Sequence, residues 1–481
     1  MLQKSDTPSV RELLEADPER PRRHSWRGDN WLFDWSRVPI DDAALDAIIS
    51  ELREVGLESA TQRLFAGEQV NPSEGQSATH TRLRQQPRPE STRRFLEQAE
   101  RLHSGQAGLS DLIHIGIGGS DLGPRLIDRA LAEGDSALRV HWLSSLDSRS
   151  CRALLSELDP ASTGMVLASK SFTTEETLVQ AAVVRDWLGP AWAERSWAAT
   201  ARPDRAREFG LPDEAILGFP DSVGGRFSLW SSIGVSAAAS IGRERFESLL
   251  DGAAEADQAF LAAQGDLGGQ RELATMLAVL LHHFRRGLDR PTLGVISYEP
   301  RLSLLGDFLQ QLIMESLGKG ADLDDRPLDR PTAPLVFGGI GTGAQHSIFQ
   351  ALHQGADDHS LILVGTVRDR QADPAWQRTQ LAHLLAQAQA LAFGRQEGRA
   401  CQRMPGNRPV ALLLGRELDA RSLGYLLASF EHAVFALSVL WQINPFDQWG
   451  VEEGKRLAGN FSRRLASDEP DLEDFPDAGF F

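Results

Sequence analysis

Apolar residues recur along this chain with two different spacings, and these predict alternating helices and strands. A helical stripe, with apolar residues three or four positions apart, is formed by Leu45, Ile48, Ile49, Leu52 and Val55. Short apolar runs bounded by turn residues predict strands at 112–117, 165–169, 292–297, 335–337, 361–367 and 409–415. A long apolar helix is predicted over residues 425–441, and residues 1–40 predict an irregular arm with short helical pieces. This order of elements is typical of an α/β protein.

Composition narrows the class of protein. The 481 residues are enough for two or more domains, and 41% of them are hydrophobic. A net charge of -17 argues against a nucleic acid or an anionic membrane as partner. The two cysteines, Cys151 and Cys401, lack metal-ligand spacing, and no apolar run approaches membrane-spanning length. The first ten residues contain no hydrophobic signal core. We therefore expect a reduced, cytoplasmic protein without a metal site.

Glu315 is a candidate general base. Six apolar residues precede it at helical spacing: Leu304, Leu305, Phe308, Leu309, Leu312 and Ile313. Gly318 is the expected C-cap, so Glu315 should lie in the last turn, at the edge of the apolar stripe. Both positions disfavour the ionised carboxylate, which suits a base that takes a proton from carbon and returns it. The ordinary alternative is a solvated surface glutamate.

Two glycine- and serine-rich loops follow predicted strands and are candidate anion sites. The first contains Gly118, Gly119, Ser120 and Asp121, ahead of a helix start. It does not fit a dinucleotide fingerprint, because Asp121 stands at the third glycine position. The second loop brings four hydroxyl or ammonium side chains to one helix start: Ser169, Lys170, Ser171 and Thr174. Thr173 and Glu176 form a capping-box pattern there. We interpret the first loop as a site for a phosphate or a sugar hydroxyl, and the second as a cradle for a phosphate monoester, with ordinary helix capping as the alternative for the second. The two loops can meet at a topological switch point of one parallel sheet.

Two further residues, Arg226 and His346, stand at positions that suit a catalytic site. Arg226 follows the paired Gly224 and Gly225, although a structural ion pair would explain it equally well. His346 is predicted in the first turn of a helix opened by Thr342 and Gln345, where the helix dipole would keep the imidazole neutral. A satisfied core histidine is the alternative.

The segment near the C-terminus adds a glutamine and a lysine. Gln448 is expected in a turn, and Lys455 in the first half of the helix that follows. From there a flexible cation could reach a site on the facing domain, whereas a solvated lysine is the alternative.

A competing hypothesis comes from the region around His346. Gly339, Gly341 and Ala344 satisfy a G-x-G-x-x-A dinucleotide pattern after a predicted strand. Asp369 follows the next strand and could accept a hydrogen bond from a ribose hydroxyl. On spacing alone, an NAD-binding domain stays open.

The chemistry of these residues suits proton transfer beside a carbonyl in a phosphorylated sugar. Two segments resemble the signatures of the phosphoglucose isomerase family: "DSVGGRFSLWSSIG" and "NPFDQWGVEEGK". Its other blocks are matched in the same order by "IGIGGSDLG", "ASKSFTTEET", "MESLGKG" and "GTGAQH". The resemblance runs from about residue 71 to residue 460. Ser171 replaces the usual Thr and Gln76 the usual Arg, and "GTGAQH" lacks a more common Asn-Gly.

The resemblance implies two sugar-isomerase-type α/β domains, each a mostly parallel sheet flanked by helices. We expect an N-terminal helical segment over 1–95 packed on the large domain, a small domain over 96–245 and a large domain over 246–481 with C-terminal helices. It implies a homodimer that interconverts glucose 6-phosphate and fructose 6-phosphate through a cis-enediol, without a cofactor.

The resemblance also implies roles for single residues. Glu315 matches the base, Arg226 the arginine that stabilises the enediolate, and Lys455 a lysine that assists ring opening. His346 matches the ring-opening histidine, which in the family enters from the neighbouring subunit. Substrate contacts are expected from Gly119, Ser120, Ser169, Lys170, Ser171, Thr174 and Gln448. A sugar-phosphate sensor that binds without catalysis is a third class, which would need the cradle but not Glu315.

Overall fold

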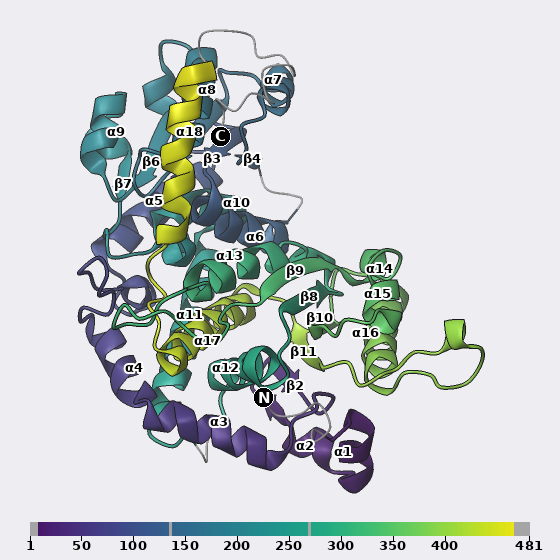
Figure 1. Ribbon diagram of the computed structural model, residues 1–481. Helices are drawn as coiled ribbons and strands as arrows, with labels where there is room; N and C mark the ends of the chain where they lie inside the picture. Colours follow the sequence, from purple (N-terminus) through teal and green to yellow (C-terminus); the bar gives the residue numbers. More distant parts are fainter. Residues whose placement is uncertain (1–7, 134–136, 268–270, 466–481) are drawn as a thin grey trace.

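The chain folds around two separate β-sheets. The computed structural model describes residues 8–133, 137–267 and 271–465, and Figure 1 shows one sheet above the other. The upper, five-stranded sheet is parallel and has the order β4-β3-β5-β6-β7. Its strands are β3 (Asp111–Ile115), β4 (Arg139–Leu143), β5 (Thr163–Ala168), β6 (Ser196–Thr200) and β7 (Ile216–Gly218). Since β4 and β5 lie on opposite sides of β3, the strand order reverses there and leaves a switch point between β3 and β5.

Helices surround the five-stranded sheet. They are α5 (Glu90–His103), α6 (Leu122–Leu131), α7 (Ser148–Glu157), α8 (Glu175–Leu188), α9 (Pro203–Phe209) and α10 (Val235–Ile241). Every residue of β3, β5 and β6 is buried, as expected for strands of a parallel sheet covered on both faces.

The second sheet has six strands in the order β1-β2-β11-β10-β8-β9. Its strands are β1 (Ser25–Arg27), β2 (Trp31–Asp34), β8 (Thr292–Ser297), β9 (Leu335–Ile340), β10 (Ser360–Arg368) and β11 (Val410–Glu417). The last four are parallel, whereas β2 pairs antiparallel with β11 and β1 antiparallel with β2. The mostly parallel α/β class is therefore confirmed.

The irregular arm expected over residues 1–40 is only partly correct, because β1 and β2 add an antiparallel edge to the large sheet. Trp31 and Phe33 alternate inward and are buried, while Leu32 between them is partly exposed. The Trp31 indole Nε1 also donates a hydrogen bond to the Ser422 carbonyl at 2.9 Å. Alternation over four residues is short, which is why the sequence pattern did not reveal this strand.

Most of the remaining helices form the body around the six-stranded sheet. They are α1 (Val10–Ala16), α2 (Arg20–Arg23), α3 (Asp42–Glu54), α4 (Leu57–Ala66), α11 (Arg243–Gln264), α12 (Leu273–His282), α13 (Leu305–Leu317), α14 (Gly341–Ala344), α15 (Phe349–Gln354), α16 (Pro374–Phe393) and α17 (Ala420–Trp441). The last helix, α18 (Glu452–Leu465), lies along the upper part of the protein instead, as Figure 1 shows. The expectation that no apolar run approaches membrane-spanning length is wrong for helix α17, which is apolar and long enough to cross a membrane; 89% of its most apolar window is, however, buried in the protein. It is therefore the core helix of this body.

A buried charge cluster links segments that are distant in the sequence. The Arg84 guanidinium donates hydrogen bonds to Asp257 on α11, the shortest of these being 2.6 Å long. It donates another, of 2.5 Å, to Glu431 on α17. Glu431 also accepts from the Trp230 indole at 2.8 Å, in the short 3-10 helix that begins at Gly225. None of these side chains is more than 2% exposed. Burial raises the pKa of Glu431 to about 7, opposed by Arg84.

Loss of the shared cation should destabilise the fold. Arg84→Met would leave the carboxylates of Asp257 and Glu431 buried without the cation that they share, so we expect the free energy of unfolding to fall by about 3 to 5 kcal/mol. Urea unfolding measures this. Arg243→Met is the matched control, since Arg243 pairs at 2.9 Å with Glu247 and both side chains are 38% exposed. A similar loss in both variants would contradict the assignment.

Candidate active site

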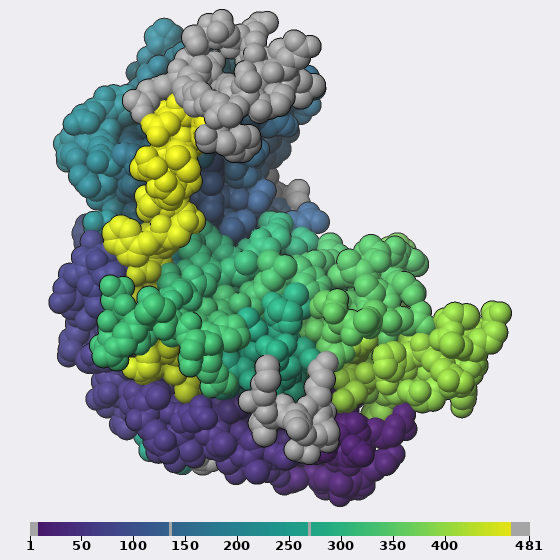
Figure 2. All heavy atoms as spheres, viewed as in Figure 1, coloured from purple at the N-terminus to yellow at the C-terminus, as the bar shows by residue number. Residues whose placement is uncertain are grey.

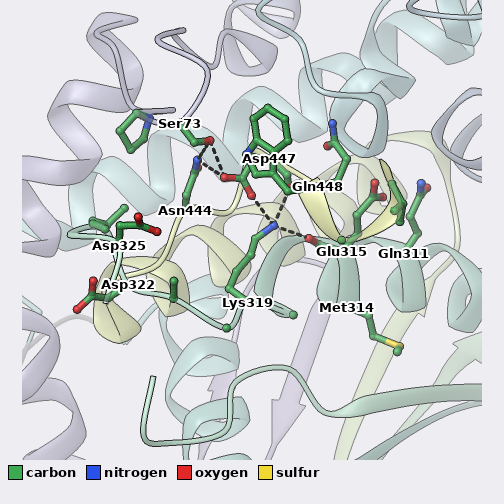
Figure 3. A pocket seen from close by; sticks show the side chains of 18 of the residues that line it. Ser73, Gln311, Met314, Glu315, Lys319, Asp322, Asp325, Asn444, Asp447 and Gln448 are labelled. Carbon is green, nitrogen blue, oxygen red and sulfur yellow. Dashed lines mark hydrogen bonds and ion pairs between the residues drawn. The ribbon is translucent and has the colours of Figure 1, made fainter. Parts of the chain in front are cut away.

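A polar cleft lies where the end of α13 meets the turn that follows α17. Its cavity has a volume of about 1040 Å³. The lining comes mainly from α13, from residues 318–325 and from residues 444–451. In Figure 3 the side chains of Ser73, Gln311, Glu315, Lys319, Asp447 and Gln448 are drawn around this space. The cavity is large enough for a small organic ligand and is lined by charged and amide groups.

Glu315 lies in the last turn of α13, as predicted. The helix ends at Leu317 with Gly318 as C-cap, where a Cβ would lie 2.5 Å from the Met314 carbonyl oxygen. The Glu315 side chain is 24% exposed and lines the cavity. Its Oε1 lies 3.5 Å from Nη1 of Arg226, so a carboxylate and a guanidinium face each other at the cleft.

Arg226 carries a buried charge that is held from several sides. Its Nε donates to Ser316 Oγ at 2.6 Å and its Nη1 to Gln448 Oε1 at 3.0 Å. Its Nη2 donates to the carbonyls of Asp447, at 3.1 Å, and Pro445. Burial lowers the pKa of Arg226, and the negative charges of Glu315 and Asp447 oppose that shift. A cation fixed in this way can stabilise negative charge that develops nearby without having to reorganise.

Asp447 and Lys319 form a second charged pair in the cleft. The Asp447 Oδ1 lies 2.8 Å from Lys319 Nζ. The other carboxylate oxygen accepts from Ser73 Oγ at 2.6 Å and from Asn444 Nδ2 at 2.8 Å. Burial lowers the pKa of Lys319, and the hydrogen bond to Asp447 opposes this shift only in part. Sequence reasoning did not single out Lys319, Asp447, Asn444 or Gln311, although all four lie within or beside the quoted motifs.

The first predicted anion loop lies against this cleft. A Cβ on Gly119 would lie 2.1 Å from the Gly225 carbonyl oxygen, so the glycine allows the loop to pack on the segment that carries Arg226. Gly118 has φ +59, and its Cβ would lie 3.1 Å from Gln311 Nε2. Ser120 is buried, and its carbonyl accepts from His114 Nε2 at 2.7 Å.

The second anion loop follows β5 at the same sheet edge. Helix α8 begins at Glu175 with Thr174 as N-cap, so the predicted Thr173–Glu176 capping box is wrong. Phe172 adopts φ +53, which for a bulky residue is strained and turns the chain before the helix starts. The Thr174 hydroxyl caps nothing and lies 3.4 Å from Ser169 Oγ. The turn thus brings these two hydroxyls together.

Lys170 and Ser171 take other partners. Lys170 Nζ lies 3.5 Å from Asp221 Oδ1, and Ser171 Oγ accepts from the Thr173 hydroxyl at 2.8 Å. Among the described residues that line the cavity, none comes from this second loop.

Two of the expected catalytic residues lie outside the cleft. His346 is exposed in a turn between α14 and α15, and the helix start predicted from Thr342 and Gln345 is wrong because α14 begins at Gly341. Gln345 instead donates to the Tyr298 hydroxyl at 2.8 Å. Lys455 lies on α18, where its side chain is 66% exposed and bonds Glu452 at 2.7 Å. In Figure 2 this helix, in yellow, runs over the surface of the upper part of the protein.

The residues of the dinucleotide pattern have structural partners. A Cβ on Gly341 would lie 2.4 Å from the Tyr298 ring, so packing on this tyrosine explains the glycine. Asp369 lies 3.4 Å from Arg301 and forms an ion pair. Helix α14 spans only four residues, shorter than the helix of a dinucleotide-binding unit. In the described part of the chain, no group of three or more His, Cys, Asp or Glu side chains is arranged to hold a metal ion.

The fold and cleft define a class of α/β proteins with two mainly parallel sheets and a charged site beside them. The family model for phosphoglucose isomerase matches residues 34–476, so this chain belongs to the phosphoglucose isomerase family. Glucose-6-phosphate isomerase of Xanthomonas oryzae pv. oryzae is 40% identical over 474 residues, 96% of this chain and 93% of that protein. The enzyme of the same name from Stenotrophomonas maltophilia is 40% identical over 97% of this chain and 94% of its own length.

Solved structures give the same result. The crystal structure of a glucose-6-phosphate isomerase from Chlamydia trachomatis matches with a TM-score of 0.87 and 30% identity, over 96% of this chain and 94% of that one. A hypothetical protein from Thermus thermophilus matches with a TM-score of 0.71 and 28% identity, over 90% and 99% of the two chains. The family and the fold class that the motifs indicated are confirmed.

The buried His114 behind the first loop should make stability depend on pH. It accepts from the Ser236 hydroxyl and donates to the Ser120 carbonyl, and burial lowers its pKa to about 4. Because the unfolded chain binds this proton below about pH 6.5, acidification favours unfolding. Between about pH 7 and about pH 5, the free energy of unfolding of the unchanged protein should fall by about 2 kcal/mol more than that of His114→Asn. Urea unfolding of both proteins at both pH values measures this difference. Equal losses would contradict the neutral, buried histidine.

Proposed function

We propose that this chain interconverts glucose 6-phosphate and fructose 6-phosphate. The observation that carries the proposal is the facing pair of Glu315 and Arg226 at a polar cleft, 3.5 Å apart. Membership of the phosphoglucose isomerase family and relatives named glucose-6-phosphate isomerase over nearly the whole chain support it. The reaction moves one hydrogen between neighbouring carbons.

Glu315 is proposed as the base of this transfer. In the open-chain aldose it takes the proton from C2, the electron pair of that C–H bond forms the C1–C2 double bond, and the π pair of the C1 carbonyl moves to O1, which gives a cis-enediolate. A proton passes from the O2 hydroxyl to O1. When the carboxyl of Glu315 returns its proton to C1, the C2–O2 double bond forms and gives the ketose. Oxidation at C2 balances reduction at C1, so the reaction consumes no external oxidant or reductant such as a nicotinamide. Arg226 faces the negative oxygen of the enediolate.

The two loops after β3 and β5 are proposed to bind the substrate. Clustered hydroxyls, an ammonium group and free backbone N–H groups at a helix start suit a phosphate dianion. The proposed contacts are Gly119, Ser120, Ser169, Lys170, Ser171, Thr174 and Gln448. The Thr174 hydroxyl makes no capping hydrogen bond to the helix start and lies near the Ser169 hydroxyl, and both observations support this assignment.

Ring opening is assigned to His346 and Lys455, with His346 entering the neighbouring subunit's site in a homodimer. Exposure of His346 and the 78% exposed Trp376 on α16 support a second subunit at this face. A segment near residue 400 also projects from the body, as Figure 1 shows.

We further propose a cytoplasmic enzyme without cofactor and with domains over 1–95, 96–245 and 246–481. The strands of the five-stranded sheet all lie between residues 111 and 218, which supports the boundaries proposed for the middle domain.

Turnover of fructose 6-phosphate in deuterated buffer tests the proposed function. We expect glucose 6-phosphate to form without added cofactor, with solvent deuterium at C1 or C2. Glu315→Gln should abolish exchange, because the base is lost, and should leave sugar-phosphate binding nearly intact. Equal activity in this variant would falsify the assignment of the base. A need for added nicotinamide would favour a dehydrogenase, and binding without turnover a sensor.

A mixing experiment tests whether the subunits share a site. Glu315→Gln and His346→Ala homodimers should each be inactive. After dissociation and reassociation, mixed dimers carry one site with both intact residues, so activity should return. Mixtures that stay inactive although hybrids form would show that His346 serves its own subunit.

A further inference from the structure

Lysine is rare in this chain, and its few positions are informative. Of 50 lysine and arginine residues only four are lysines: Lys4, Lys170, Lys319 and Lys455. Either side chain serves as a solvated surface cation, so a chain that uses arginine almost everywhere keeps lysine where a compact ammonium is required. Lys4 lies outside the described residues. Lys170 and Lys455 belong to the site proposed above, and Lys319 has no role so far.

The surroundings of Lys319 suit an ammonium group. Its side chain is 12% exposed and lines the cleft. Nζ donates to the Glu315 carbonyl at 3.0 Å and to the Asp447 carbonyl, and lies 2.8 Å from the Asp447 carboxylate. Figure 3 shows these three contacts converging on one nitrogen. An ammonium has three donors directed tetrahedrally, whereas the donors of a guanidinium lie in a plane.

These contacts join the two segments between which the proposed chemistry takes place. On one side, the ammonium bonds an otherwise free carbonyl in the last turn of α13, the helix that carries Glu315. On the other side, it holds Asp447, whose carbonyl also accepts from Arg226 at 3.1 Å. The next residue, Gln448, accepts from Arg226 at 3.0 Å. A shift of Asp447 would therefore move the guanidinium relative to the carboxylate.

Further bonds keep Asp447 in place. Its second carboxylate oxygen is bonded by Ser73 and Asn444, so the carboxylate cannot turn away without breaking them. With both oxygens and its backbone carbonyl engaged, Asp447 is the point where three chain segments meet.

We infer that the Lys319–Asp447 ion pair sets the position of Glu315 relative to Arg226, which makes Lys319 a positioning residue for proton transfer. The inference rests on the proposed function, because it assigns the transfer to Glu315 and Arg226. Its physical basis is the steep dependence of such a step on geometry, since a misplacement of about 1 Å costs about 100-fold in rate.

Steady-state kinetics on fructose 6-phosphate tests this role. Lys319→Met keeps most of the length of the side chain and removes the charge, and we expect kcat to fall about 100-fold. KM should change by less than about threefold, as for an interaction needed only in the transition state. The Kd of glucitol 6-phosphate, which lacks the carbonyl, should change as little. Lys319→Arg should also lower kcat, by about tenfold or more, because the planar guanidinium does not match the three acceptors.

Arg326→Met is the matched control. It breaks an ion pair of 2.9 Å with Asp324 in the same stretch of chain, where both side chains are more than 60% exposed. We expect its kcat and KM to equal those of the unchanged protein.

Three results would overturn the inference. They are a kcat within about twofold of the original in Lys319→Met, full activity in Lys319→Arg, and a raised KM with unchanged kcat. The last would make Lys319 a substrate contact. If Lys319→Met does not fold, the kinetics of Lys319→Arg decide the question.

Hydrogen exchange of the amides of 444–448 tests the ion pair separately from turnover. The exchange should be faster in Lys319→Met and unchanged in Arg326→Met. Inactivity of the unchanged protein would refute the proposed function alone.

Discussion

The buried positive charge of Arg226 is the constraint on which the site depends. Because the Arg226 side chain is only 2% exposed, its guanidinium must find acceptors within the protein, since an unpaired charge away from water is costly. Its acceptors come from α13 and from the turn after α17, while its own segment packs on the Gly118–Ser120 turn. One side chain thereby brings the first anion loop, the helix of Glu315 and the Gln448 turn to the same place.

Much of the fold could be predicted from apolar spacing. The strand at 292–297 is observed with the predicted bounds, and the helix predicted over 425–441 is the C-terminal part of α17. These elements have long, uniform patterns. The short edge strand β2 and the starts of α8 and α14 were missed or misplaced. Their limits depend on tertiary pairing with β11, on the strained turn at Phe172 and on packing against Tyr298.

The candidate site was predictable only in its local parts. The last-turn position of Glu315 and the Gly318 cap follow from helix geometry. The pairing of Arg226 with Glu315 joins residues 89 positions apart, and that of Lys319 with Asp447 joins residues 128 apart, so neither leaves a spacing signal. The assignments of His346 and Lys455 rest on family resemblance, because both are exposed in the single chain.

The cluster around Arg84 has a consequence for how the chain acquires its fold. Arg84 meets partners 173 and 347 residues away in the sequence, and one of them in turn bonds Trp230. Closing such long loops is entropically costly until many contacts form together, so this cluster is completed late. We therefore expect the local strand and helix units to form first, and the charges to be removed from water only when the last core helix, α17, packs into place.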